Sequence, residues 1–115
     1  MVKFEPKYKR PFVHFVKKQH KPLQAVIEDE VLAICGDPRM GEAKLGDLAG
    51  IRVHKFTFKG QEYLIAYFAP EVGPREDEIV PEGSTHSIIE FYQIGPHEKF
   101  YENLKAYLKA NGWYR

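Results

Sequence analysis

The spacing of apolar residues changes several times along the chain, and each change predicts a different element. Residues 2–8 fit a short strand, and two runs with helical spacing follow it. Pro11 and Pro22 each stand where the first turn of a helix tolerates proline, because the N–H group of that position has no partner within the helix. Gly36 then favours a helix end, since glycine adopts the left-handed conformation of a helix cap without strain. We therefore expect an antiparallel helical hairpin between residues 11 and 36.

The second half of the chain shows the two-residue period of β-strands. Lys59-Gly60 is a tight-turn sequence between two alternating runs, and Asn111-Gly112 ends the last helical run. The predicted order is strand, helix, helix, three strands and helix, which is an α+β fold. In that fold the N-terminal strand and the helical hairpin pack on a small, mostly antiparallel sheet that also carries the C-terminal helix. The three strands and the last helix are expected over residues 51–58, 61–69, 87–94 and 97–110.

Length and composition fit one globular domain. The chain has 115 residues, of which 43% are hydrophobic and 14% are aromatic, so residues 1–115 can form a single core. No apolar run approaches the roughly 20 residues of a membrane helix, and the N-terminus lacks the apolar core of a signal peptide. We therefore expect a cytoplasmic protein with no membrane association. The single cysteine, Cys35, excludes an internal disulfide and fits a small core residue.

Charge is distributed unevenly along the chain, although the net charge is only +1. Residues 71–86 contain five acidic residues and one arginine, a balance of −4, so the rest of the chain has a balance of +5. A basic body of this kind is compatible with binding a polyanion. The acidic segment is too long for a hairpin turn, so it fits either a functional flap or a surface insertion.

Three side chains with acid–base or charge chemistry gather where the last strand is expected to meet the last helix. His97, Lys99 and Tyr101 fall in the first turns of the predicted helix, and the four-residue spacing of His97 and Tyr101 puts both on one helix face. The positive end of the helix dipole favours an anion at the same place. Histidine suits proton transfer because its ordinary pKa of about 6.5 lies near neutral pH. Tyr101 equally fits the apolar stripe of the helix, which is its structural alternative.

A second candidate pair lies on the predicted strand 51–58. Arg52 and His54 are two positions apart, so they point to the same face of the strand, whereas Lys55 points to the other face. A solvated sheet face is the structural alternative for Arg52 and His54. The chain has no His-x-His and no His-x-x-Glu-His sequence, so a catalytic metal site is not expected.

Six short sequences after the predicted hairpin form an ordered set: Asp37-Pro38-Arg39, Lys44-Leu45, Leu48-Ala49-Gly50, Ile51-Arg52-Val53-His54, Tyr63-Leu64-Ile65-Ala66-Tyr67 and Ile94-Gly95-Pro96-His97-Glu98-Lys99-Phe100-Tyr101. Each alone is unspecific. Their order and spacing together resemble the RelE/ParE family of type II toxins, and the resemblance covers nearly the whole chain.

The resemblance implies an activity and a set of partners. Most of that family cleave mRNA on the ribosome, so the chain would be a metal-independent, ribosome-dependent endoribonuclease that needs no cofactor and inhibits translation. The ribosome would place the substrate, because such toxins bind in its A site and cut the codon there. The family also implies a small antitoxin protein that covers the basic groove and forms a hetero-oligomer with the toxin.

The resemblance also implies roles for individual residues. Metal-free RNA cleavage needs a base for the 2′-OH, an acid for the departing 5′-oxygen and cations for the phosphoryl oxygens. His97 and His54 would share the acid and base work, and Arg52 would stabilise the phosphate. Tyr101 would stack on or orient a base. The lysines expected to bind RNA phosphates are Lys44, Lys55 and Lys99.

Two other functions remain open at the level of the sequence. A ParE-like poison of DNA gyrase binds a protein target and does no chemistry of its own. A RelE-fold protein that has lost toxicity is the other alternative. Leu64, which stands where many ribosome-dependent members carry an arginine, and the acidic segment 71–86 favour this last alternative.

Overall fold

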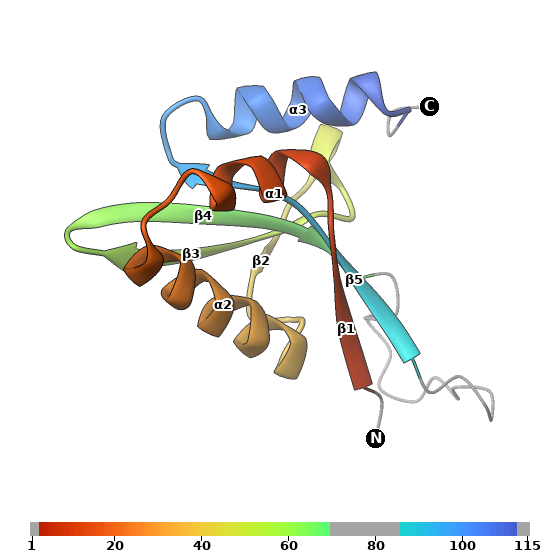
Figure 1. Ribbon diagram of the computed structural model, residues 1–115. Coiled ribbons are helices and arrows are strands. Elements are labelled where there is room, and N and C mark those ends of the chain that lie inside the picture. Colours follow the sequence, from red (N-terminus) through yellow and green to blue (C-terminus); the bar gives the residue numbers. More distant parts are fainter. Residues whose placement is uncertain (1–2, 70–85, 113–115) are drawn as a thin grey trace.

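The computed structural model describes residues 3–69 and 86–112 (Figure 1). The predicted acidic segment lies outside the described residues except at its last position. In chain order the elements are β1 (Lys3–Tyr8), α1 (Arg10–Lys17), α2 (Lys21–Gly36), β2 (Glu42–Ala43), the 3₁₀ turn η1 (Gly46–Leu48), β3 (Arg52–Phe58), β4 (Gln61–Phe68), β5 (His86–Pro96) and α3 (Phe100–Ala110).

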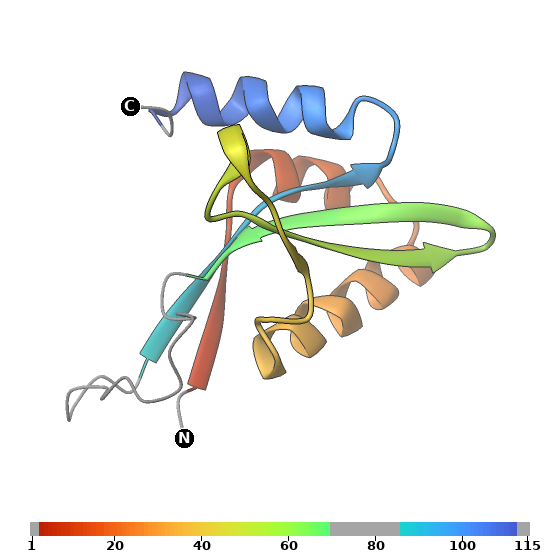
Figure 2. The same ribbon diagram turned by 180° about the vertical axis from the view of Figure 1, so that it is seen from behind.

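Five strands form one sheet in the order β1-β5-β4-β3-β2. β1 is parallel to β5, and the other neighbouring pairs are antiparallel. The first strand therefore lies beside the last one, as the view from behind also shows (Figure 2). This arrangement confirms the predicted α+β fold with a mostly antiparallel sheet. The short edge strand β2 and η1 lie between the hairpin and β3, where the sequence predicted no helix or strand.

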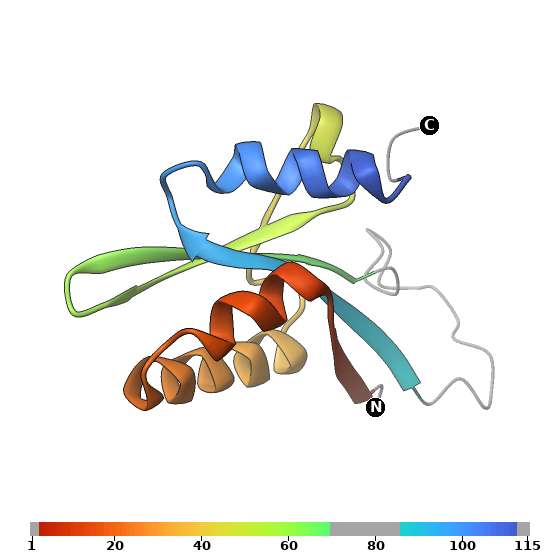
Figure 3. The ribbon, with the colours of Figure 1, turned by 45° about the horizontal axis from the view of Figure 1, so that its top comes forward.

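The sheet separates two layers of helices. The hairpin of α1 and α2 covers one face, and α3 covers the other (Figure 3). Each face has its own apolar core, because successive side chains of a strand point to opposite faces. Phe56, Ile65 and Phe91 pack on the hairpin side, and Val53, Leu64 and Ala66 pack against α3. No helix within the described ranges is long and apolar enough to cross a membrane.

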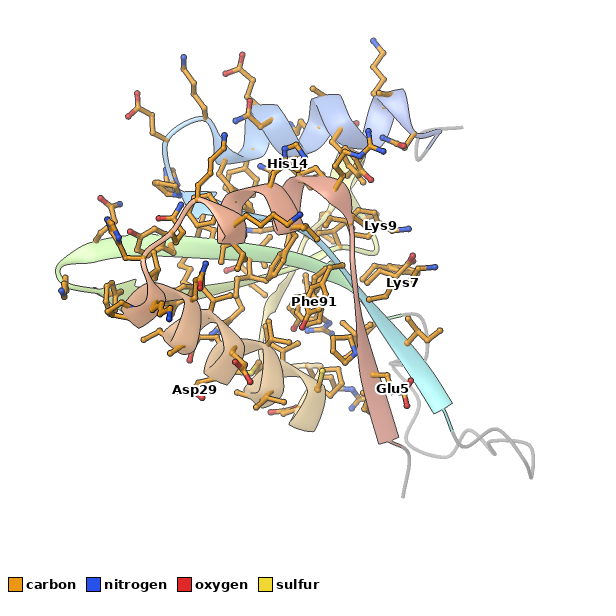
Figure 4. The ribbon with its side chains drawn as sticks, viewed as in Figure 1. Glu5, Lys7, Lys9, His14, Asp29 and Phe91 are labelled. Atoms are coloured by element: carbon orange, nitrogen blue, oxygen red, sulfur yellow. The ribbon has the colours of Figure 1, made fainter. Side chains whose placement is uncertain are left out.

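The helical hairpin forms as its sequence predicts. Proline stands in the first turn of both α1 and α2, where its missing N–H group removes no helical hydrogen bond. α2 ends at Gly36. Phe91 of β5 lies between the sheet and the helices, as the side-chain view shows (Figure 4). The buried apolar face of α2 consists of Leu23, Ile27, Val31 and Ile34.

The start of the last helix differs from the prediction. β5 continues to Pro96 and α3 begins only at Phe100, so His97 and Lys99 precede the helix. Lys99 has a φ of 60°, a left-handed conformation that cannot continue a right-handed helix. A backbone bond from the Phe100 N–H to the His97 carbonyl closes this turn at 3.1 Å. The residue in the left-handed conformation is a lysine, so the sequence offers no glycine to mark the break.

Candidate functional site

The sheet divides the predicted site residues into two groups. Val53 packs in the core beneath α3, whereas Phe56 packs in the core beneath the hairpin. Arg52 and His54 share the side of Phe56, because they lie four and two positions before it on β3. Lys55 shares the side of Val53. The prediction that Lys55 points away from the face shared by Arg52 and His54 is therefore confirmed.

Arg52 is bound to the backbone of the loop that precedes β2. Its Nη1 donates hydrogen bonds to the carbonyl oxygens of Arg39 at 3.1 Å and Gly41 at 2.8 Å. The same loop is held by Tyr67, whose hydroxyl donates to the Pro38 carbonyl at 2.7 Å and accepts from the Gly41 N–H at 2.9 Å. These bonds fix residues 38–41 against β3 and β4.

Gly41 is required by this contact. A Cβ at that position would lie 2.6 Å from the Tyr67 hydroxyl oxygen, and Tyr67 itself is fully buried. The approach of the loop backbone to the tyrosine therefore excludes any side chain at residue 41 unless Tyr67 moves.

His54 is paired with a residue of the hairpin. Its Nε2 lies 2.8 Å from Oε1 of Glu30 on α2, and the exposed fractions of the two side chains are 13% and 26%. The imidazole ring stacks beside Phe56, with 6.5 Å between ring centroids. No motif in the sequence signals the approach of Glu30 to β3.

On the other face of the sheet, His97, Tyr101 and Lys44 form a connected cluster. The rings of His97 and Tyr101 meet edge to face, with centroids 6.0 Å apart. The ammonium nitrogen of Lys44 lies 5.3 Å from the centroid of the Tyr101 ring. His97 is exposed and Tyr101 is half-buried. Three elements therefore bring an imidazole, a phenol and an ammonium group together at the surface.

Lys44 is kept cationic by its neighbours. Its Nζ donates to Oε1 of Glu42 at 2.8 Å, and this hydrogen bond raises the pKa of Lys44, with hydrogen bonding to Tyr101 adding to the effect. The hydrogen bond with Lys44 lowers the pKa of Glu42, and the charge of Lys55 adds to this effect. Glu42 pairs with Val53 across β2 and β3, two positions from Lys55, so Lys55 lies near the same edge of the sheet. The sequence predicted Lys44 and Lys55 as site residues but not Glu42. Glu42 stands on an edge strand two positions before Lys44, and this spacing is the signal that could have identified it.

The turn before α3 carries His97 and Lys99. The Asn103 N–H donates to the Lys99 carbonyl at 2.9 Å, and the buried Gln93 side chain donates to the Phe100 carbonyl at 2.8 Å. No side chain caps the first turn of α3. The N-terminal N–H groups and the positive end of the helix dipole lie next to the exposed His97 and Lys99, an arrangement that favours an anion.

A single cluster containing His97, His54 and Arg52 does not form, and the expectation that the two histidines share one site is corrected. The sheet lies between them, because β3 places Arg52 and His54 under the hairpin while β5 and α3 place His97 and Tyr101 on the opposite face. Within residues 3–69 and 86–112, no group of three or more His, Cys, Asp or Glu side chains is arranged to hold a metal ion.

Comparison with known families decides the class of the protein. Residues 7–105 match a family described as ParE-like toxin of type II bacterial toxin–antitoxin system. The chain belongs to the ParE-like toxin family. It is thus a toxin of a type II toxin–antitoxin system, and an antitoxin is the partner of such a toxin. No curated protein and no solved structure matches the chain.

Proposed function

We propose that this ParE-like toxin inhibits translation by cleaving mRNA on the ribosome, at the cluster of His97, Tyr101 and Lys44. The observation that carries the proposal is the exposed imidazole of His97 in ring contact with Tyr101, beside an ammonium group whose pKa is raised. Proton transfer and anion stabilisation are thereby available at one surface, next to the N-terminus of α3.

Each group has a role that its chemistry fits. The neutral imidazole of His97 removes the proton from the 2′-OH, and the resulting oxygen attacks the adjacent phosphorus. The phosphorus–5′-oxygen bond breaks and a protonated 5′-OH leaves, giving a 2′,3′-cyclic phosphate. The Tyr101 hydroxyl supplies the proton for the leaving oxygen. The ammonium groups of Lys44 and Lys99 offset the charge that develops on the phosphoryl oxygens.

Poisoning of DNA gyrase is the second candidate function. It is favoured by the positions of three residues that bear on cleavage. Arg52 and His54 are bound to neighbouring groups of the protein, and Leu64 is fully buried beneath α3. Within the described part of the chain, His97 is the one histidine in the cluster with Tyr101 and Lys44. A toxin that binds a protein target needs no second proton-transfer residue, and the family name includes ParE.

The test is primer extension on mRNA in a translating extract, with the wild-type protein and with His97→Gln. Cleavage predicts new 5′ ends inside the reading frame that require translating ribosomes and disappear in His97→Gln. Lys59→Gly serves as a control, because Lys59 is an exposed residue in the turn between β3 and β4. Absence of cleavage, together with inhibited supercoiling by purified gyrase, would replace the proposal with the second candidate.

A further inference from the structure

The longest run of uncompensated charge lies in the N-terminal third of the chain. Residues 6–27 contain six lysine or arginine residues, two histidines and no acidic residue. The net charge of the whole chain is only +1. The positive charge of this stretch is therefore larger than the net charge of the whole protein, and the rest of the chain has a net negative charge.

Five of these residues form a surface that we name the basic stripe. Three of them are positions i, i+4 and i+7 of α1, and a fourth, at i+8, is the C-cap residue, which keeps a right-handed helical conformation. These four positions fall on one side of the helix, while Phe12 faces the core on the other side. A fifth residue is the first of α2 and follows the turn between the helices. All five are exposed: Arg10, His14, Lys17, Lys18 and Lys21.

The described residues provide no ionic partner for the stripe. Their ion pairs are Lys9–Glu90, Lys44–Glu42 and His54–Glu30, and none includes a residue of the stripe. The acidic residues of α2 begin only at Glu28. Figure 4 shows Asp29 on the part of the hairpin remote from His14.

The placement also runs against the preferences of helix ends. Neither α1 nor α2 has an acidic residue in its first turn, and neither has a side-chain cap. Arg10 and Lys21 instead put positive charge at the positive ends of the two dipoles, which is unfavourable. The helix dipole explains why Lys17 and Lys18 lie at the C-terminal end of α1, where positive charge is favourable, but it does not explain the positions of Arg10 and Lys21. Such local conflicts are expected where a sequence serves binding in addition to folding.

A solvated helix face would have a different pattern. Exposed helix faces commonly combine charges of both signs at i and i+4, because these pairs stabilise the helix. Here Arg10, His14 and Lys18 repeat at that spacing, and no acidic residue stands among them. The charges therefore do not support one another, and an external anion would relieve their repulsion.

We propose that the basic stripe binds the phosphate backbone of nucleic acid, at a surface separate from the His97 cluster. Residues 10–18 of a helix span about 12 Å, which corresponds to three or four nucleotide steps of a duplex strand at about 3.4 Å each. The stripe contains no exposed apolar side chain, and lysine is depleted at protein–protein interfaces. Interfaces with nucleic acid are polar and positively charged, so the stripe matches them better than it matches an acidic protein.

The proposal is tested by binding of fluorescent RNA and DNA duplexes to the full chain across a range of salt concentrations. In the triple variant Lys17→Gln/Lys18→Gln/Lys21→Gln, the slope of log K against log[salt] should fall by about 2–3, since each phosphate contact contributes about 0.9 for duplex DNA. Affinity at low salt should fall at least tenfold. The preferred duplex identifies the source of the phosphate backbone.

The matched control is Lys59→Gln/Lys105→Gln/Lys109→Gln, which removes the same charge from exposed positions away from the stripe. It should keep most of the wild-type slope. Equal reductions of the salt slope and of the affinity in both triple variants would overturn the proposal, because the net charge of the protein would then explain the binding. Stripe-dependent binding of polyglutamate without binding of either duplex would also overturn it. Duplex binding is measured without ribosomes and without cleavage, so failure of the cleavage proposal and failure of this one are distinguishable.

Discussion

The two faces of the sheet differ in what their polar side chains contact. Beneath the hairpin, Arg52 and His54 are engaged by loop carbonyls and by Glu30. Beside α3, His97 is exposed and contacts Tyr101 through its ring. The two histidines therefore differ in what they can bind. His54 is hydrogen-bonded within the protein, whereas His97 faces solvent. Changes to Arg52 and His54 should therefore alter stability, and changes to the exposed His97 should alter activity.

The largest effect on stability is expected from Gly41→Ala. The new Cβ would lie 2.6 Å from the Tyr67 hydroxyl and 2.9 Å from its ring, so a fully buried ring must shift, at a cost of about 1–3 kcal/mol. Chemical unfolding measures the change. Gly36→Ala is the control, because nothing lies within 4 Å of its added Cβ. If Gly41→Ala is as stable as Gly36→Ala, the loop does not approach Tyr67 as closely as described.

A smaller loss of stability, about 1–2 kcal/mol, is expected from His54→Ala. The substitution removes the bond to Glu30 and the ring beside Phe56, and partial exposure of the pair limits its contribution. A double-mutant cycle with Glu30→Gln isolates the pair, and we expect a coupling of about 0.5–1.5 kcal/mol. No coupling would show that His54 and Glu30 do not interact in solution.

Buried tyrosines on both faces should make stability fall at alkaline pH. Burial raises the pKa of Tyr92 strongly, with the Glu90 charge adding to it, and burial also raises the pKa of Tyr67. Because the folded-state pKa values exceed the ordinary value of about 10, this contribution is complete below about pH 10. It is lost as the pH rises through the folded values. Urea unfolding as a function of pH measures the loss, and Tyr92→Phe should reduce it more than Tyr67→Phe. A larger reduction with Tyr67→Phe would contradict the stronger rise of the Tyr92 pKa.

The smallest change in stability is expected when either of two lysines with a positive φ is replaced by glycine. Lys59 and Lys99 have φ values of 49° and 60°, so glycine at either position should relieve strain and change stability by no more than about 1 kcal/mol. Both variants lose one positive charge, but only Lys99→Gly loses it beside His97. We expect a several-fold drop in mRNA cleavage for Lys99→Gly and none for Lys59→Gly. Equal activity of the two variants would remove Lys99 from the site.

The sequence predicts the elements well because their signals are local. Pro11, Pro22 and Gly36 mark the hairpin, and alternation on β3 predicts that Arg52 and His54 share a face. The partners on that face are not predictable, because Glu30 approaches His54 only when α2 packs on the sheet. The start of α3 is missed because Lys99 adopts a conformation for which glycine is the usual signal. His97 and Tyr101 do meet, but through a turn and not through the helical spacing that suggested it.

The most direct test compares His97→Ala with His54→Ala in ribosome-dependent mRNA cleavage, at a temperature where both variants are fully folded. Loss of a general base costs about 10²–10⁴-fold in rate. If cleavage takes place at the cluster of His97, Tyr101 and Lys44, this loss is expected for His97→Ala alone. His54→Ala should cleave at close to the wild-type rate despite its lower stability. Loss of cleavage in His54→Ala with full activity in His97→Ala would contradict the account and move the reaction to the hairpin face.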